Sequence, residues 1–178
     1  MSRECPVSMQ EQTSTGGEGS VFGFLTAVDS AAHGTFGGYL LVDALGRPLE
    51  FHCTTPVKVS RAQQILYGPT LQAHLHGMQI GATLLAEGGI TPAVVLTDLE
   101  SMLQVRPHTS HPVALVKRAA DAADASGIVV GSARVHPHAS DGERTPQIEE
   151  RLRELSAAVD LSEPFERIRA AIDEAQRH

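Results

Sequence analysis

Three strand-like segments follow one another closely between residues 21 and 54, and they constrain the fold more than any other feature of the chain. The first is the apolar run 21–28, the second spans 37–43, and the third, 49–54, alternates apolar and polar residues. Short turns containing Gly, Asp and Pro separate them. Connections of this length join antiparallel neighbours, so the sequence predicts a three-stranded antiparallel meander.

The hydrophobic period changes after the third segment. Ser60 can cap a first helix, which the Gly68-Pro69 pair interrupts, and Thr70 can cap a second helix. The continuous apolar run 93–98 then ends in an acidic residue. Such runs are typical of a buried strand in a parallel arrangement. The pattern therefore predicts an α/β (α+β) fold in which a parallel strand extends the meander.

The remainder of the chain supplies further short elements. Residues 112–116 are either a strand or the start of an Ala-rich helix, and 128–130 form another strand candidate. Two apolar stripes at helical spacing, between 148 and 175, predict a helical hairpin. These stripes can pack on the parent domain or bind a partner. The predicted organisation is a disordered leader (1–19), an α/β domain (20–139), and a linker with the hairpin (140–178).

Charge and composition limit the functions that this chain can have. Its 14 Lys and Arg against 21 Asp and Glu give a net charge of -7, which disfavours general nucleic-acid binding because that needs a basic surface. Between residues 19 and 118 the charges balance, so most of the acidic excess lies outside this range. No segment is apolar enough to suggest a signal peptide or a bilayer span. We therefore expect a cytoplasmic protein without membrane association.

Several short motifs between about residues 20 and 105 resemble the ribonuclease H-like superfamily. The first strand ends in Val28-Asp29-Ser30, a Gly-rich turn leads into the second strand, and Gly46-Arg47 precedes the third. The run Val94-Val95-Leu96-Thr97-Asp98 is similar to the strand that carries the second aspartate of the family. The resemblance implies a ribonuclease H-like order of strands and helices.

The resemblance also implies a possible nuclease site. Nucleases of this class hold two Mg²⁺ or Mn²⁺ ions between three or four carboxylates. Asp29 and Asp98 would be the outer metal ligands and catalytic residues. No acid stands at the helix position, where Arg61 is followed by Ala, Gln and Gln, and Glu50 can replace it only by pointing into the same cleft. The acidic cluster is therefore incomplete, which favours a degenerate, non-catalytic version of the fold.

The segment between the two predicted helices is a second candidate site. It contains a charge, an amide, a phenol and a hydroxyl at Arg61, Gln63, Tyr67 and Thr70. Free N–H groups at a helix start after Thr70 would attract an anion, with Arg61 and Tyr67 beside it. The alternative is a kinked helix over the sheet with no ligand.

Taken together, these patterns predict a non-catalytic subunit that binds another macromolecule through its ribonuclease H-like domain and helical tail. A protein partner or self-association fits the neutral centre and acidic tail better than nucleic acid. Two alternatives stay open: a nuclease dependent on Mg²⁺ or Mn²⁺, and a small-ligand sensor that uses the segment from Arg61 to Thr70.

Overall fold

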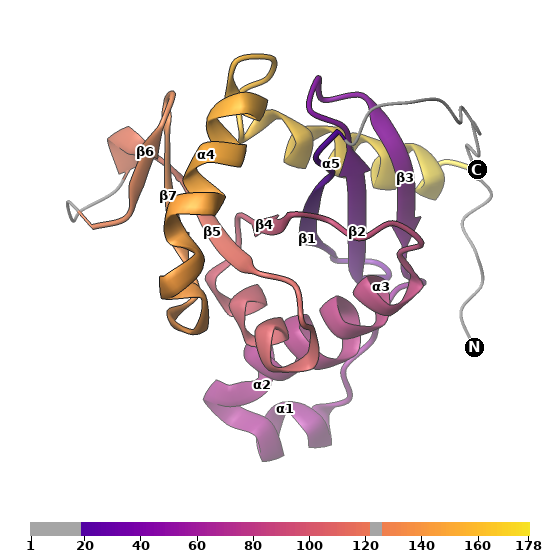
Figure 1. Ribbon diagram of the computed structural model, residues 1–178. Helices are drawn as coiled ribbons and strands as arrows, with labels where there is room; N and C mark the ends of the chain where they lie inside the picture. The colour runs from indigo at the N-terminus through magenta and orange to yellow at the C-terminus, as the bar shows by residue number, and fades with distance from the viewer. Residues whose placement is uncertain (1–18, 122–125) are drawn as a thin grey trace.

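The meander predicted from the short turns is present in the computed structural model, which describes residues 19–121 and 126–178 (Figure 1). β1 (Phe22–Ser30) pairs antiparallel with β2 (Gly34–Val42), which pairs antiparallel with β3 (Pro48–Cys53). Gly34 adopts a φ of 104° at the first turn, a conformation that L side chains rarely adopt. The leader predicted for residues 1–19 lies outside the described residues except for Gly19.

A parallel strand extends the meander, as the sequence predicts. β4 (Val94–Thr97) lies parallel to β1, and β5 (Val113–Arg118) lies parallel to β4. The segment at 112–116 is therefore a strand rather than the start of a helix. β7 (Ala133–Pro137), which the sequence did not indicate, and β6 (Ile128–Val130) complete a seven-stranded mixed sheet in the order β3-β2-β1-β4-β5-β7-β6.

One face of the sheet is covered by the helical segments that follow β3 and β4. Gly77 allows two of them to pack closely, because a Cβ atom there would lie 2.8 Å from Cβ of Gln104. The segments are α1 (Arg61–Tyr67), η1 (Gly68–Thr70), α2 (Leu71–Ala73), the π-helix η2 (His74–Gly81), α3 (Ala82–Glu87) and the 3-10 helix η3 (Glu100–His108).

The opposite face is covered by the two C-terminal helices, α4 (Thr145–Ser156) and α5 (Glu163–Gln176). Their predicted apolar stripes are buried in one core with β1, β2, β4, β5 and β7. Ser162 precedes α5 without capping it, since its hydroxyl donates to Asp160 at 2.5 Å. Two short 3-10 segments, η4 (Ala119–Asp121) and η5 (Ala139–Arg144), connect the last elements.

The alternation of side chains along β1 separates the two cores. Phe22 and Phe24 point toward α4 and α5, whereas Leu25 points toward η2 and η3. This alternation decides on which face each polar residue of the sheet lies. No helix in the described parts of the chain is both long and apolar enough to cross a bilayer.

Candidate functional site

The two aspartates of the predicted nuclease site lie on opposite faces of the sheet. Asp29 lies four residues after Leu25 on β1, so its side chain points to the same face of the sheet. Its carboxylate accepts a hydrogen bond of 2.6 Å from Thr35. Asp98 instead accepts a hydrogen bond of 2.7 Å from Thr26, which points to the other face with Phe24. The sheet itself therefore separates the two carboxylates.

Asp98 is already paired with a cation. Its carboxylate forms an ion pair with Arg169 of α5, and both side chains are partly exposed. The pair borders a cavity of about 270 Å³ at the carboxyl ends of β4 and β5, which Lys117 and Glu166 also line. Arg169 supplies the positive charge that a metal ion would bring to this carboxylate, so the surroundings of Asp98 do not fit a metal pair.

Glu50 lies far from Asp29 along the sheet and on the opposite face from Asp98. Its neighbour on β2 is Leu41, which pairs with Gly23 on β1, six residues before Asp29. Six residues of extended chain correspond to about 20 Å. The Glu50 carboxylate accepts from the amide of Gly89 at 3.0 Å and lies 2.9 Å from Nε2 of His52.

The structure therefore does not bring Asp29, Asp98 and Glu50 into one site. Among the residues that the structure describes, no group of three or more His, Cys, Asp or Glu side chains could hold a metal ion. A pair of divalent metals about 4 Å apart needs carboxylates converging from neighbouring elements. The described residues do not fit such a pair, and we derive no metal-dependent step.

The second candidate segment contains a helix built by local hydrogen bonds. The hydroxyl of Ser60 accepts from the amide of Gln63 at 3.1 Å, and Oε1 of Gln63 accepts from the amide of Ser60 at 3.0 Å. This reciprocal capping box fixes the start of α1. The Gln63 side chain is thereby used within the helix, while Arg61 donates to Gln64 at 3.3 Å.

The helix start expected at Thr70 differs from the prediction. The prediction that Thr70 caps a new helix is wrong, because Thr70 has helical backbone angles and its hydroxyl donates to the carbonyl of Tyr67 at 2.7 Å. The chain continues from η1 into α2 without the free helix start that would attract an anion. The Tyr67 ring stacks on His74, with ring centroids 4.4 Å apart.

α1 presents its apolar residues to solvent. No residue of this helix is buried, and Ile65 and Leu66 are 65% and 83% exposed. Tyr67 and Met78 are also exposed, and Met78 lies four residues after His74 in η2. We refer to these four exposed residues, Ile65, Leu66, Tyr67 and Met78, as the α1 patch. The sequence predicted the helix but not its exposure, because the spacing of apolar residues does not say which side faces the core.

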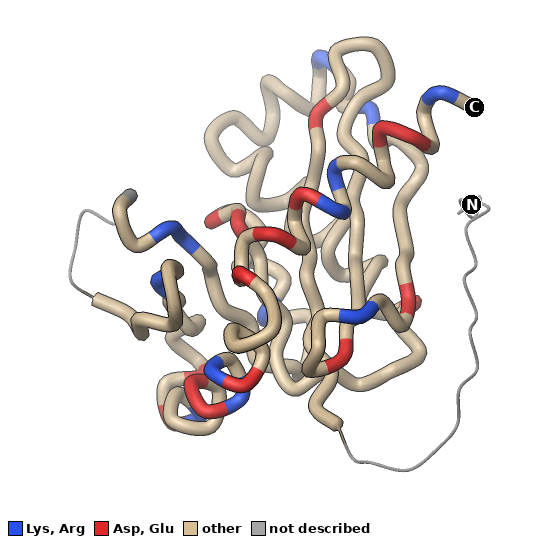
Figure 2. The backbone as a smooth tube through the Cα atoms, turned by 90° about the horizontal axis from the view of Figure 1, so that it is seen from above, with Lys and Arg blue, Asp and Glu red and all other residues tan. Residues whose placement is uncertain are grey.

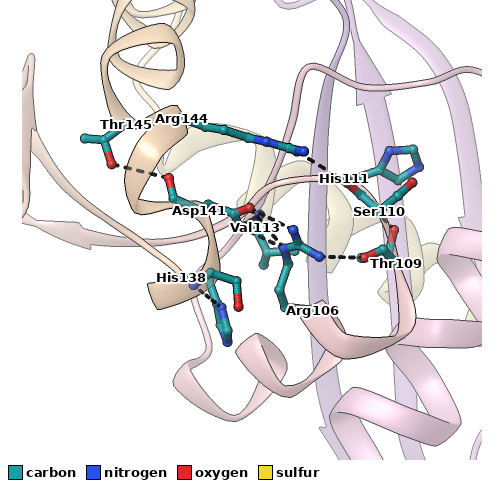
Figure 3. Close-up of polar contacts among 10 residues, drawn as sticks. Arg106, Thr109, Ser110, His111, Val113, His138, Asp141, Arg144 and Thr145 are labelled. Atoms are coloured by element: carbon teal, nitrogen blue, oxygen red, sulfur yellow. Dashed lines mark hydrogen bonds and ion pairs between the residues drawn. The ribbon is translucent and has the colours of Figure 1, made fainter.

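A buried ion pair lies in the segment that the sequence predicted to be a linker (Figure 3). Asp141 is fully buried, and the guanidinium of Arg106 donates to both of its carboxylate oxygens at 2.9–3.1 Å. The amide of Val113 donates to the same carboxylate at 3.1 Å, and Arg106 also donates to the carbonyl of Thr109 at 2.7 Å. The pair thus ties η3, the start of β5 and η5 together.

The surroundings of this ion pair favour its charged form. Burial alone would raise the pKa of Asp141, but hydrogen bonds from Arg106 and the Val113 amide outweigh it and hold that pKa below its usual value. The hydrogen bond to Asp141 raises the pKa of Arg106 despite its partial burial. Every donor to the Asp141 carboxylate belongs to the fold itself, so we assign this pair to stability rather than to chemistry.

Comparison with known proteins identifies no relative. No protein-family model matches the chain, and neither a curated protein nor a solved structure matches it significantly.

Proposed function

We propose that this protein binds another macromolecule, without catalysis, through the α1 patch. The observation that carries the proposal is the exposure of the apolar side of α1. Four of the six large hydrophobic side chains that are most exposed among the described residues lie between positions 65 and 78. Single exposed apolar residues are ordinary on a protein surface, whereas a group on one helical segment is typical of an interaction surface.

The local construction of α1 supports this role. A seven-residue helix is unstable alone, yet this one has a capping box at Ser60 and ends at Gly68, which has a φ of 51°. These features hold the helix in place although it contributes no buried residue to the core. A partner surface would explain why the helix is formed and its apolar side is uncovered.

The C-terminal helices offer less for a partner. The apolar stripes of α4 and α5 include Leu152, Phe165 and Ile168, all of which are buried against the sheet. A partner would have to displace these helices to reach their apolar sides. We therefore place the interaction surface on α1 and assign the helical tail to the core.

The fold proposed with this function is a degenerate form of the ribonuclease H-like class. The antiparallel meander of β1, β2 and β3, extended by the parallel strand β4, supports that assignment. The pairing of Asp98 with Arg169 and the separation of Asp98 from Asp29 support the absence of two-metal catalysis. The cytoplasmic location expected from the sequence is part of the same proposal.

The test is affinity purification of the tagged full-length protein from its own cells, followed by reconstitution with the identified component. We expect a stoichiometric partner with wild type, and none with Leu66→Asp. Because Leu66 is 83% exposed, this substitution should leave the fold intact, which circular dichroism and the melting temperature would check.

Leu45→Asp is the matched control, because Leu45 is a 62% exposed leucine outside the α1 patch. It should retain the partner. Equal retention by wild type and by Leu66→Asp would overturn the assignment of the surface. A wild-type protein that retains no partner at all would overturn the proposed function.

A further inference from the structure

We propose that the α1 patch accepts an apolar segment of another protein that is flanked by acidic residues. The inference rests on the proposed function and specifies the chemistry of the partner. It comes from the charges around the patch, which differ from those of the rest of the protein.

The chain around the patch is devoid of acidic residues. Not one Asp or Glu occurs from Phe51 through Ala86, although the chain contains 21 acidic residues and has a net charge of -7. Lys58 and Arg61 lie in this stretch, and both are exposed. The described contacts give neither of them an ion pair, since Arg61 donates only to the neutral Gln64. The apolar surface of α1 is thus accompanied by one cation on the same helix, Arg61, which forms no ion pair among the described contacts.

The C-terminal helices differ from α1 in charge: Figure 2 shows acidic and basic segments following each other along the helix that leads to the C-terminus. α5 carries both signs of charge, and ion pairs such as Arg167 with Glu163 at 2.7 Å neutralise them. Lys58 lies beside Gly34, at the turn that follows Asp29. Arg61, one helical turn before Ile65, has no acidic partner among the described contacts. An acidic partner protein would compensate this charge, which gives electrostatic complementarity around an apolar centre.

A second copy of this chain fits the patch poorly. A symmetric contact through α1 would bring Arg61 of both copies to the same interface, where like charges repel. An asymmetric contact, in which the patch of one copy meets a different face of the second copy, would need exposed apolar residues next to acidic residues on that face. Among the described residues, the apolar rows of the acidic helices α4 and α5 are buried.

Membranes and nucleic acids also fit less well than a protein. Attraction to an anionic lipid surface contributes about 1 kcal/mol for each Lys or Arg near it. Lys58 and Arg61 are the only such residues from Phe51 through Ala86, in a protein of net charge -7. Nucleic-acid binding needs a larger number of phosphate contacts. Tyr67 is the one aromatic residue of the patch, and its ring already stacks on His74, so the patch offers little free stacking surface for bases.

The inference is tested by selection from a displayed library of random peptides. The full-length wild-type protein is the bait, and Leu66→Asp is the counter-selection bait. We expect the enriched peptides to combine apolar residues three or four positions apart with an excess of Asp and Glu. Synthetic versions should bind wild type and Leu45→Asp equally, and Leu66→Asp about thirtyfold more weakly, as is typical of a central interface residue.

Charge reversal then tests the role of the cations. Arg61→Glu should weaken the acidic peptides about two- to fivefold, the effect of one exposed charge pair, and added salt should reduce the difference. We call peptides that bind wild type but not Leu66→Asp patch-specific. If the patch-specific peptides are neutral or basic, the acidic-partner inference is overturned while the proposed binding function stays intact. Failure to enrich any patch-specific peptide would also overturn it, even if a nucleic acid or lipid were found to bind. The purification experiment judges the binding function separately.

Discussion

The buried pair of Arg106 and Asp141 gives the sharpest prediction about stability. Arg106→Met keeps much of the volume of the side chain but removes its charge and its donors. The Asp141 carboxylate is 0% exposed, and among the described residues the Val113 amide would then be its one remaining donor. Removing one partner of a buried ion pair costs about 3–5 kcal/mol, because the other charge stays buried without compensation.

Chemical denaturation in urea and a thermal melt would measure this loss. A protein of this size loses about 2–4 °C of melting temperature per kcal/mol, so we expect a decrease of about 10 °C. The double variant Arg106→Met/Asp141→Leu removes both charges together and should lose much less stability than Arg106→Met alone. Arg153→Met is the matched control, because its ion pair with Glu149 is exposed and should contribute less than about 1 kcal/mol.

The same prediction has a pH dependence with a definite sign. Since the folded state holds the pKa of Asp141 below its unfolded value, the pair stabilises the protein above about pH 4 and loses that contribution as the pH falls through the folded pKa. The difference between wild type and Arg106→Met should therefore shrink in acid. The expected loss at neutral pH is about 3–5 kcal/mol. A free energy of unfolding for Arg106→Met that lies within about 1 kcal/mol of the wild-type value would therefore refute the reasoning.

Three further predictions concern other parts of the structure. Burial lowers the pKa of His76 in the folded protein, although the nearby charge of Asp29 opposes this shift. The unfolded chain therefore takes up the proton first, and the free energy of unfolding should fall by up to about 1 kcal/mol between pH 6.5 and 5.5. Urea denaturation at the two pH values should find a smaller decrease for His76→Asn. Gly37→Ala should cost about 1–3 kcal/mol, because its Cβ would lie 2.1 Å from Cγ2 of Ile80, and adding Ile80→Leu should recover part of that loss in the same assay. Excess Mn²⁺ should leave the melting temperature unchanged, whereas an increase that Asp98→Asn abolishes would favour the nuclease alternative.

The sequence predicted the elements whose signals are local. The strands of the meander follow from short turns between apolar segments, and α1 follows from Ser60 as a cap before apolar residues at helical spacing. The stripes of α4 and α5 follow from the helical period, and the structure buries both. Each of these signals operates between residues that are close together in the sequence.

The contacts that decide the candidate site connect distant residues. Thr26 and Asp98 are 72 positions apart, and Arg106 and Asp141 are 35 apart. A polar stretch such as 140–146 has the composition of a linker whether or not its aspartate is buried, so composition alone could not reveal this ion pair. The position of Asp29 at the end of an apolar strand likewise did not show on which face it would lie.

At the α1 patch, the local spacing of apolar residues and the long-range packing of the fold lead to different expectations for the same side chains. Apolar residues at helical spacing predict a helix that packs on its own sheet, and Leu75 and Ile80 in η2 do so. The chain reaches this buried segment only after Gly68 has redirected it at the end of α1, and the apolar residues before that turn stay exposed. Intramolecular packing thus accounts for η2 but leaves Ile65 and Leu66 without a contact that would explain their side chains. The partner that we propose would supply that contact, and the lack of acidic residues from Phe51 through Ala86 is the basis for proposing that this partner is acidic.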